Sequence, residues 1–179
     1  MEMEEKNLKK LMNRITVRRY VNLHADGNPL ELGTIDDLIK RIAEMDSPKY
    51  SIAINIKSMP GNDEREEAGY LKEIINEEMA KKRFPHWIHE ADAIDSLLHH
   101  LNGLLEDPAL LIFYQFTSPD DEKEKNLLRS IRKFIQMRES LFLGLLLISS
   151  QKLYKWNILP MTDLDERIVE FFPYHNIKY

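Results

Sequence analysis

The feature that most limits the fold of this chain is a run of apolar residues from Ala109 to Phe116, interrupted only by Gln115. A strand with one solvent face alternates apolar and polar residues, whereas a strand inside a parallel sheet is buried on both faces and is apolar almost throughout. A second run of this kind extends from Leu143 to Ile148. Together the two runs predict an α/β fold built on a parallel sheet.

Segments with helical and strand-like patterns alternate along the chain. The expected strands are 15–23, 50–56, 109–116 and 143–148, and the expected helices are 34–45, 64–83, 91–105, 118–138 and 162 to 171 or 172. Such alternation indicates right-handed βαβ crossovers, and it predicts a three-layer sandwich with a mainly parallel sheet of about five strands. For 179 residues the economical interpretation is one domain over 1–179, with 1–14 as a helical or flexible lead-in.

Composition excludes several kinds of chemistry and location. The chain has no cysteine, so it has no disulfides, thiolate metal sites or thiol nucleophiles. No secretory signal is visible at the amino end, and the longest apolar run, Leu141 to Ser149, has about half the roughly 20 residues that span a bilayer. The formal charge is −5. We therefore expect a cytoplasmic protein with no membrane or nucleic-acid partner and no cofactor.

The region from Tyr50 to Phe172 resembles the nucleoside-triphosphatase core of the STAND class of signalling ATPases in element order and hydrophobic pattern. Residues 50–79 correspond to its first strand, phosphate loop and helix, residues 105–120 to the strand that ends in metal-binding acids, and residues 141–172 to the strand that ends in a polar sensor. The resemblance implies a degenerate P-loop NTPase-like fold. It also implies kinship with the inactive STAND modules of bacterial conflict systems.

Two departures from the STAND pattern affect the chemistry. A working phosphate loop needs G-x-x-x-x-G-K-[ST], because its backbone N–H groups and its lysine bind phosphate oxygens. The segment from Gly61 to Gly69 has no Gly-Lys pair and carries acidic residues that repel a polyphosphate: Asp63, Glu64, Glu66 and Glu67. The strand ending at Phe116 leads to Thr117 instead of a metal-binding aspartate, although Asp120 and Asp121 follow. Both departures argue against ATP hydrolysis.

Two weaker patterns suggest metal chemistry. His24, Asp26 and Lys57 are similar to the strand-end residues of metal-dependent phosphodiesterases of the glycerophosphodiesterase type, although that barrel usually needs about 250 residues. Separately, Asp92, Asp95 and His99 would share one face of a helix and could bind a divalent metal. An acid-rich helix start is equally expected from the helix dipole, so a solvated helix face explains the second pattern as well.

Basic residues on the predicted helix 118–138 are candidates for an interaction surface. These are Arg129, Arg132, Lys133 and Arg138, and Trp156 is a further candidate after the next strand. An amphipathic helix that covers the sheet explains the basic residues without any partner. The leading hypothesis is a non-catalytic interaction or adaptor module in bacterial signalling or defence. It would bind a protein partner or a neighbouring domain, with a homo-oligomer left open. The alternatives are a metal-dependent phosphodiesterase or nuclease, and a nucleotide sensor that does not hydrolyse.

Overall fold

The computed structural model describes residues 5–25, 31–61, 63–117, 121–137 and 142–150, and the backbone of 169–173. A parallel sheet with the order β2-β3-β4-β1-β5 lies at its centre. Its strands are β1 (Tyr20–His24), β2 (Tyr50–Asn55), β3 (Ala109–Phe116), β4 (Leu143–Ser149) and β5 (Val169–Pro173). The predicted parallel α/β fold is therefore confirmed, with four strands described in full and β5 by its backbone alone.

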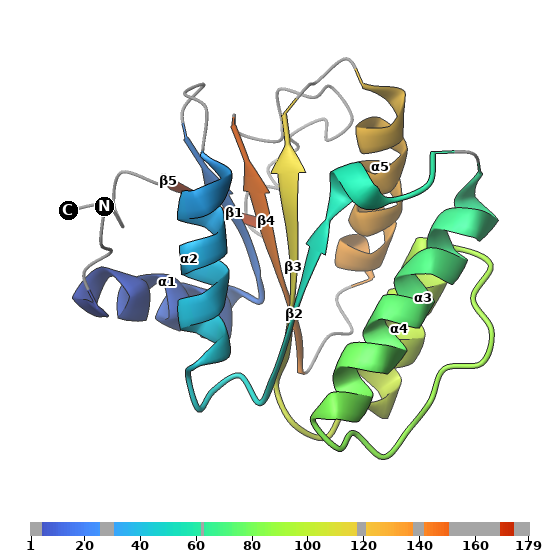
Figure 1. Ribbon diagram of the computed structural model, residues 1–179, viewed down its shortest axis with the longest axis horizontal. Helices are drawn as coiled ribbons and strands as arrows, with labels where there is room; N and C mark the ends of the chain where they lie inside the picture. The colour runs from blue at the N-terminus through green and yellow to red at the C-terminus, as the bar shows by residue number, and fades with distance from the viewer. Residues whose placement is uncertain are drawn as a thin grey trace.

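Helices cover both faces of the sheet (Figure 1). They are α1 (Glu5–Arg18), α2 (Leu32–Ala43), α3 (Glu64–Lys81), α4 (Ile94–Leu104) and α5 (Glu122–Gln136), with a short 3-10 turn, η1 (Ile56–Ser58). One apolar core lies between the sheet and α1 and α2, and a larger one lies between the sheet and α3, α4 and α5. The two cores make the three layers that the sequence predicts. None of the described helices combines the length and hydrophobicity needed to cross a membrane.

The burial of each strand follows from its place in the sheet. All of β4 is buried, and so is most of β3, because each has a strand on both sides and helices on both faces. In β2 buried and half-buried residues alternate, which is expected for a strand at the edge of the sheet. The two apolar runs are thus the interior strands that their sequences predict.

The amino-terminal strand was predicted to start too early. Residues Ile15 to Arg18 belong to α1, and β1 begins at Tyr20 after Arg19, which has a positive φ of 68°. The signal for the helix is a stripe of buried residues at helical spacing: Leu8, Leu11, Met12 and Ile15. Ile15 thus packs into the core as the last residue of this helical stripe. Of the predicted lead-in, residues 1–14, the part from Glu5 onward is helical.

Other predicted boundaries also change. Glu31, and not Thr34, is the residue before α2. The predicted helix 91–105 begins only at Ile94, since Ala93 still has extended backbone. Val169–Pro173 is a strand, so the prediction of a helix up to Phe171 or Phe172 is wrong there; the rest of that predicted helix lies outside the described residues. Residues 169–173 form a strand because their backbone pairs with β1, which is remote in the sequence.

Candidate functional site

The order of the strands locates the candidate site at the carboxyl edge of the sheet, between β1 and β4. After β1 the chain crosses to β2 at the far edge, and α2 lies on one face. The steps from β2 to β3 and from β3 to β4 run in the opposite direction, with α3, α4 and α5 on the other face. In open α/β sheets, ligands bind outside the carboxyl ends of strands where the direction of the connections reverses.

This order corrects the predicted position of the phosphate loop. The loop before α3, which follows the edge strand β2, is remote from the reversal, whereas the loop between β1 and α2 lies at it. Residues 26–30 of this loop lie outside the described residues, but their sequence is informative. Residues 20–39 contain no Lys or Arg and have four acidic residues: Asp26, Glu31, Asp36 and Asp37.

Polar side chains between the ends of β1 and β4 bind each other. The Asn22 side chain donates hydrogen bonds to the Leu147 carbonyl (2.9 Å) and to Ser149 Oγ (2.8 Å). The N–H of Ala25 donates to the Ser149 carbonyl at 3.2 Å. Asn22 is fully buried, and its hydrogen bonds compensate for the loss of water. Next to it, His24 at the end of β1 is also fully buried.

A buried carboxylate connects the ends of β2 and β3. Glu124 in the first turn of α5 has a side chain only 2% exposed, and its Oε1 accepts from Lys57 Nζ at 2.7 Å. The same oxygen accepts from the N–H of Thr117, directly after β3, at 3.1 Å. Asp121 caps α5 by accepting from the N–H of Glu124. The Glu124 carboxylate thus accepts from two donors of the chain itself, the Lys57 ammonium group and the Thr117 N–H.

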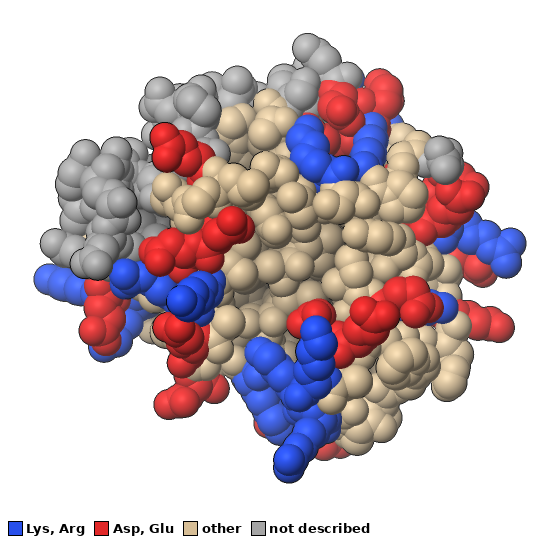
Figure 2. All heavy atoms as spheres, viewed as in Figure 1, with Lys and Arg blue, Asp and Glu red and all other residues tan. Residues whose placement is uncertain are grey.

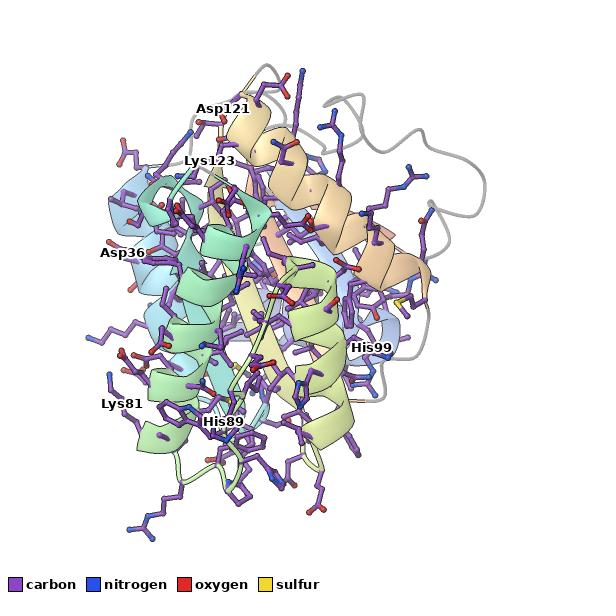
Figure 3. The ribbon with its side chains drawn as sticks, turned by 90° about the vertical axis from the view of Figure 1, so that its right-hand side faces the viewer. Asp36, Lys81, His89, His99, Asp121 and Lys123 are labelled. Atoms are coloured by element: carbon purple, nitrogen blue, oxygen red, sulfur yellow. The ribbon has the colours of Figure 1, made fainter. Side chains whose placement is uncertain are left out.

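A small pocket lies next to this ion pair, between η1 and the first turns of α3 and α5. It is lined by Ile56, Met59, Glu67, Lys123, Glu124 and Leu127. Glu67 is only 6% exposed. Burial raises the pKa of the Glu67 carboxyl, the Lys123 ammonium opposes that rise, and Glu64 and Asp63 add to it. We call this cavity the Glu67 pocket; Figure 3 labels Lys123 at the start of α5, beside α3.

The end of β3 is irregular. Gln115 has a positive φ of 71°, and the register between β3 and β4 shifts between Phe113 and Phe116. A register shift of this kind redirects side chains and is frequent near functional sites. Burial, together with the negative charge of Asp36, raises the pKa of the Tyr114 hydroxyl. The negative potential of α2 therefore reaches the end of β3.

The residues of the predicted phosphodiesterase site are not brought together. His24 ends β1 and Lys57 follows β2, so β4 and β3 lie between them and the separation is roughly 14 Å at the usual strand spacing. Lys57 is paired with Glu124, and Asp26 lies outside the described residues. His24 and Lys57, the two residues of the predicted site that the structure describes, therefore lie at the ends of different, non-adjacent strands.

The residues of the alternative metal pattern, Asp92, Asp95 and His99, do not all lie on one helix. Asp92 precedes α4 and forms an exposed ion pair with Arg65, so it does not share a helical face with Asp95 and His99. Within the described ranges, no group of three or more His, Cys, Asp or Glu residues is arranged to hold a metal ion. Figure 3 shows His99 on α4, well away from His89 in the preceding loop.

The predicted interaction residues are described only in part. Arg129, Arg132 and Lys133 lie on α5 as expected, with Arg129 donating to Asn126 and Lys133 exposed to solvent. Arg138 and Trp156 lie outside the described residues. The apolar side of α5 packs into the core, which accounts for the amphipathic pattern.

Sequence reasoning missed Asn22, Thr117 and Glu124 as partners at the carboxyl edge. A sequence signal existed for two of them. Asn22 is a polar residue inside the apolar strand β1, and Asp121 and Glu124 have the D-x-x-E spacing of a capping box. Their partners lie on other strands, so only the folded chain reveals the contacts.

Comparison with known proteins identifies the type of fold. No protein-family model matches the sequence, and no curated protein matches it. Solved structures of Drosophila ORC bound to GC-rich DNA and Cdc6 match with a TM-score of 0.59 at 11% identity. Those of Drosophila ORC bound to poly(dA/dT) DNA and Cdc6 match with a TM-score of 0.57 at 12% identity. Each match covers 94% of this chain and 28% of the other.

These matches show a likeness of fold to part of the ORC chains, and they are consistent with a P-loop NTPase-like fold. The likeness is one of fold, since the identities are low, and this chain spans less than a third of the matched chains. The matched structures are multiprotein complexes bound to DNA, so they do not support the expectation that nucleic acid is not a partner.

Proposed function

We propose that this chain is a protein-interaction module built on a P-loop NTPase-like fold and that it does not hydrolyse nucleotide. The observation that carries the proposal is the charge of the loop at the reversal of the sheet. Residues 20–39 include this loop and contain four acidic residues and no basic one. A triphosphate needs backbone N–H groups and a lysine at this position, and carboxylates there repel it.

The rest of the described carboxyl edge does not replace the missing lysine. Lys57 follows β2, three strands from β1, and its ammonium group is already paired with Glu124. The end of β3 presents Gln115, Phe116 and Thr117 in place of a carboxylate that could hold magnesium. Both observations support a role without hydrolysis.

The more specific assignment is an inactive STAND-type module that acts as an adaptor in bacterial signalling or defence. Its support is the element order of residues 50–172 together with the acidic loops after β1 and β2. The fold agrees with the P-loop NTPase-like part of this assignment. The partner is then a protein or a neighbouring domain.

The open edge of β2 is the surface that we assign to this partner. The N–H of Tyr50 donates to the Pro108 carbonyl towards β3, so the backbone groups of Ser51 and Ala53 point away from β3. These two residues are small and uncharged, whereas edges that avoid pairing usually carry Lys or Pro. Figure 2, which views this side, shows a broad area without charges between charged groups. An extended segment of the partner would add a strand here.

A thermal-shift screen with ATP, ADP and GTP, each with magnesium, tests the absence of nucleotide chemistry. A ligand at about 100 times its Kd stabilises a folded protein by about 2.7 kcal/mol, so binding would be visible as a higher Tm. We expect no rise at millimolar nucleotide. A rise that is lost in a Gly27→Ala variant would overturn the proposal in favour of a nucleotide sensor. Duplex DNA in the same screen tests the expectation, drawn from the formal charge of −5, that the chain does not bind nucleic acid.

A displayed library of short random peptides tests the β2 edge. Ala53→Pro removes an outward N–H that does not pair with β3, so the sheet should remain intact while an added strand is blocked. Peptides selected on the unmodified chain should lose binding to Ala53→Pro and keep it with the control Ala53→Ser. Hydrogen exchange at Ser51 and Ala53 should slow on binding. Peptides that bind both variants equally and protect other amides would contradict the assignment.

A further inference from the structure

The end of α3 and the loop after it form a short basic stretch in an acidic chain. Residues 79–89 contain Lys81, Lys82 and Arg83 and no acidic residue, whereas the formal charge of the whole chain is −5. Lys81 is paired with Glu78 at 2.8 Å. Lys82 and Arg83 are exposed, and neither makes an ion pair within the described residues. A local excess of positive charge can attract an acidic ligand even when the whole protein is acidic.

Arg83 occupies a backbone position that usually belongs to glycine. Its φ is 63°, and its N–H donates to the Ala80 carbonyl at 3.0 Å, while the N–H of Phe84 donates to the Met79 carbonyl at 3.1 Å. Helices often end with such a left-handed residue, and glycine is preferred there because a Cβ atom makes this conformation strained. The arginine side chain is therefore present at a cost to stability, as is common where a side chain serves a function.

The loop after Arg83 is held in place, yet it exposes a tryptophan. The buried Asn76 side chain donates to the Ile88 carbonyl at 2.8 Å and accepts from the Ile88 N–H at 2.9 Å. Lys72 donates to the carbonyl of the following residue at 3.2 Å. Trp87, directly before Ile88, is 48% exposed. A large ring on a fixed backbone binds a partner at a low cost in conformational entropy, and tryptophan is a frequent hot-spot residue.

This basic stretch lies at the amino end of the edge strand β2. The ring of Phe84, the residue after Arg83, packs edge-to-face against Tyr50, the first residue of β2, with ring centroids 5.4 Å apart. Figure 3 shows Lys81 and His89 together at the end of α3. Figure 2 shows Lys and Arg side chains gathered at the lower end of the β2 side, below the area without charges. The basic stretch thus continues the open edge of the sheet.

We propose that Lys82, Arg83 and Trp87, which we call the basic end, bind an acidic segment of the protein partner. The two cations bind carboxylates of this segment, and the Trp87 ring packs against an apolar or proline side chain in it. The partner is the one that the proposed interaction function requires. A protein segment is favoured over nucleic acid because the adjoining β2 edge offers backbone groups that pair with a peptide. The basic end adds a preference for acidic sequences that a backbone edge cannot supply.

NMR of the Trp87 indole N–H, with a capped peptide as the probe, tests the basic end. The probe is acetyl-Glu-Pro-Glu-Pro-Glu-amide, and the control peptide has Gln in place of each Glu. The Trp156→Phe variant identifies which indole signal belongs to Trp87. The Glu peptide should shift this signal in a saturable manner, and the Gln peptide should not. Because proline has no N–H, neither peptide can add to β2 as a regular strand, so the result does not depend on the β2 assignment.

Arg83→Gly separates binding from stability. Glycine suits the φ of 63°, so the Tm should stay the same or rise, whereas the Glu peptide should bind about fivefold more weakly because an exposed ion pair is lost. The matched control is Lys133→Gln, which removes one positive charge from an exposed position on α5 and should leave binding unchanged. Equal weakening by the two substitutions, or equal shifts with the Glu and Gln peptides, would overturn the proposal.

An oligothymidylate of about ten nucleotides decides between a protein and a nucleic-acid ligand, since cations beside an exposed aromatic ring also suit a single strand. We expect no saturable shift of the Trp87 indole signal with this probe. Binding of the oligonucleotide that is tighter than that of the Glu peptide and is lost in Arg83→Gly would overturn the proposal in favour of nucleic acid. The absence of a saturable shift with the Glu peptide would overturn it as well.

Discussion

Glu124 and Glu67 are two buried carboxylates that line the same small pocket, yet their surroundings are opposite. Glu124 accepts hydrogen bonds from Lys57 and from the backbone of Thr117, whereas Glu67 has no such partner in the described part of the chain. Each lies in the beginning of a helix capped by an aspartate, Asp121 for α5 and Asp63 for α3. The helix starts are alike, so the difference comes from what the rest of the fold brings to each carboxylate.

The presence of an ion-pair partner for Glu124 and its absence for Glu67 in the described part of the chain give the two carboxylates different effects on stability. The ion pair between the half-exposed Lys57 and the buried Glu124 connects the ends of β2, β3 and α5. Among the described residues Glu67 has no ion-pair partner, and partial desolvation raises the pKa of its carboxyl, so its charge costs stability at neutral pH. The comparison predicts opposite effects of substitutions at the two positions.

Lys57→Met should cause the largest loss of stability. It leaves Glu124 buried without its cation, and the expected decrease in the free energy of unfolding is about 2 kcal/mol. This figure is below the usual range for fully buried pairs because the Lys57 side chain is 42% exposed. Urea denaturation at neutral pH measures the change, with Lys57→Arg as the control that keeps the charge. A loss under about 0.5 kcal/mol would mean that the ion pair does not hold this edge together.

Glu124→Gln should destabilise the protein less, by about 1 kcal/mol, because the amide oxygen still accepts from the N–H of Thr117. Combined with Lys57→Met in a double-mutant cycle, the two losses should not add, since both remove the same ion pair. Additive losses would show that Lys57 and Glu124 act independently.

Glu67→Gln should stabilise the protein at neutral pH. Since burial raises the pKa of Glu67, the folded state holds this proton more tightly than the unfolded state does. The contribution of Glu67 is therefore most favourable in acid and is lost as the pH rises through the raised pKa. The advantage of the variant should grow with pH above the ordinary glutamate range and shrink in acid; denaturation over a pH series measures it. A constant difference would contradict the role of the carboxylate.

Glu66→Gln should have the smallest effect, within about 0.5 kcal/mol at every pH, because this neighbouring side chain is exposed. The Tm of this variant compared with that of Glu67→Gln isolates the effect of burial from that of net charge. If the stability of Glu66→Gln and that of Glu67→Gln changed equally with pH, burial of Glu67 would not explain its effect.

Much of the fold could be predicted from the sequence. The apolar runs of β3 and β4, the alternation of β2 and the apolar stripes of α3 and α4 are local patterns that identify these elements. The beginning of β1 was harder, because Ile15 suits a strand by its branching and a helix by its spacing from Leu8, Leu11 and Met12. The strand β5 depends on β1 as its partner, and no local pattern shows that pairing.

The candidate site could be predicted only in its chemistry. The acidic residues of the loops after β1 and β2 are visible in the sequence, and they argue against phosphate binding wherever the loops lie. The resemblance to the STAND pattern implied a phosphate loop after β2, in the segment from Gly61 to Gly69. The order of the strands instead puts the reversal of the connections at β1 and β4.

The sequence by itself determined that the chain builds a parallel sheet covered by helices and that the loops after β1 and β2 are acidic, since burial patterns and charge are properties of local residues. Only the tertiary structure decided the strand order, the separation of His24 from Lys57 and the different surroundings of Glu67 and Glu124. The physical reason is that these features come from packing between elements that are distant in the chain.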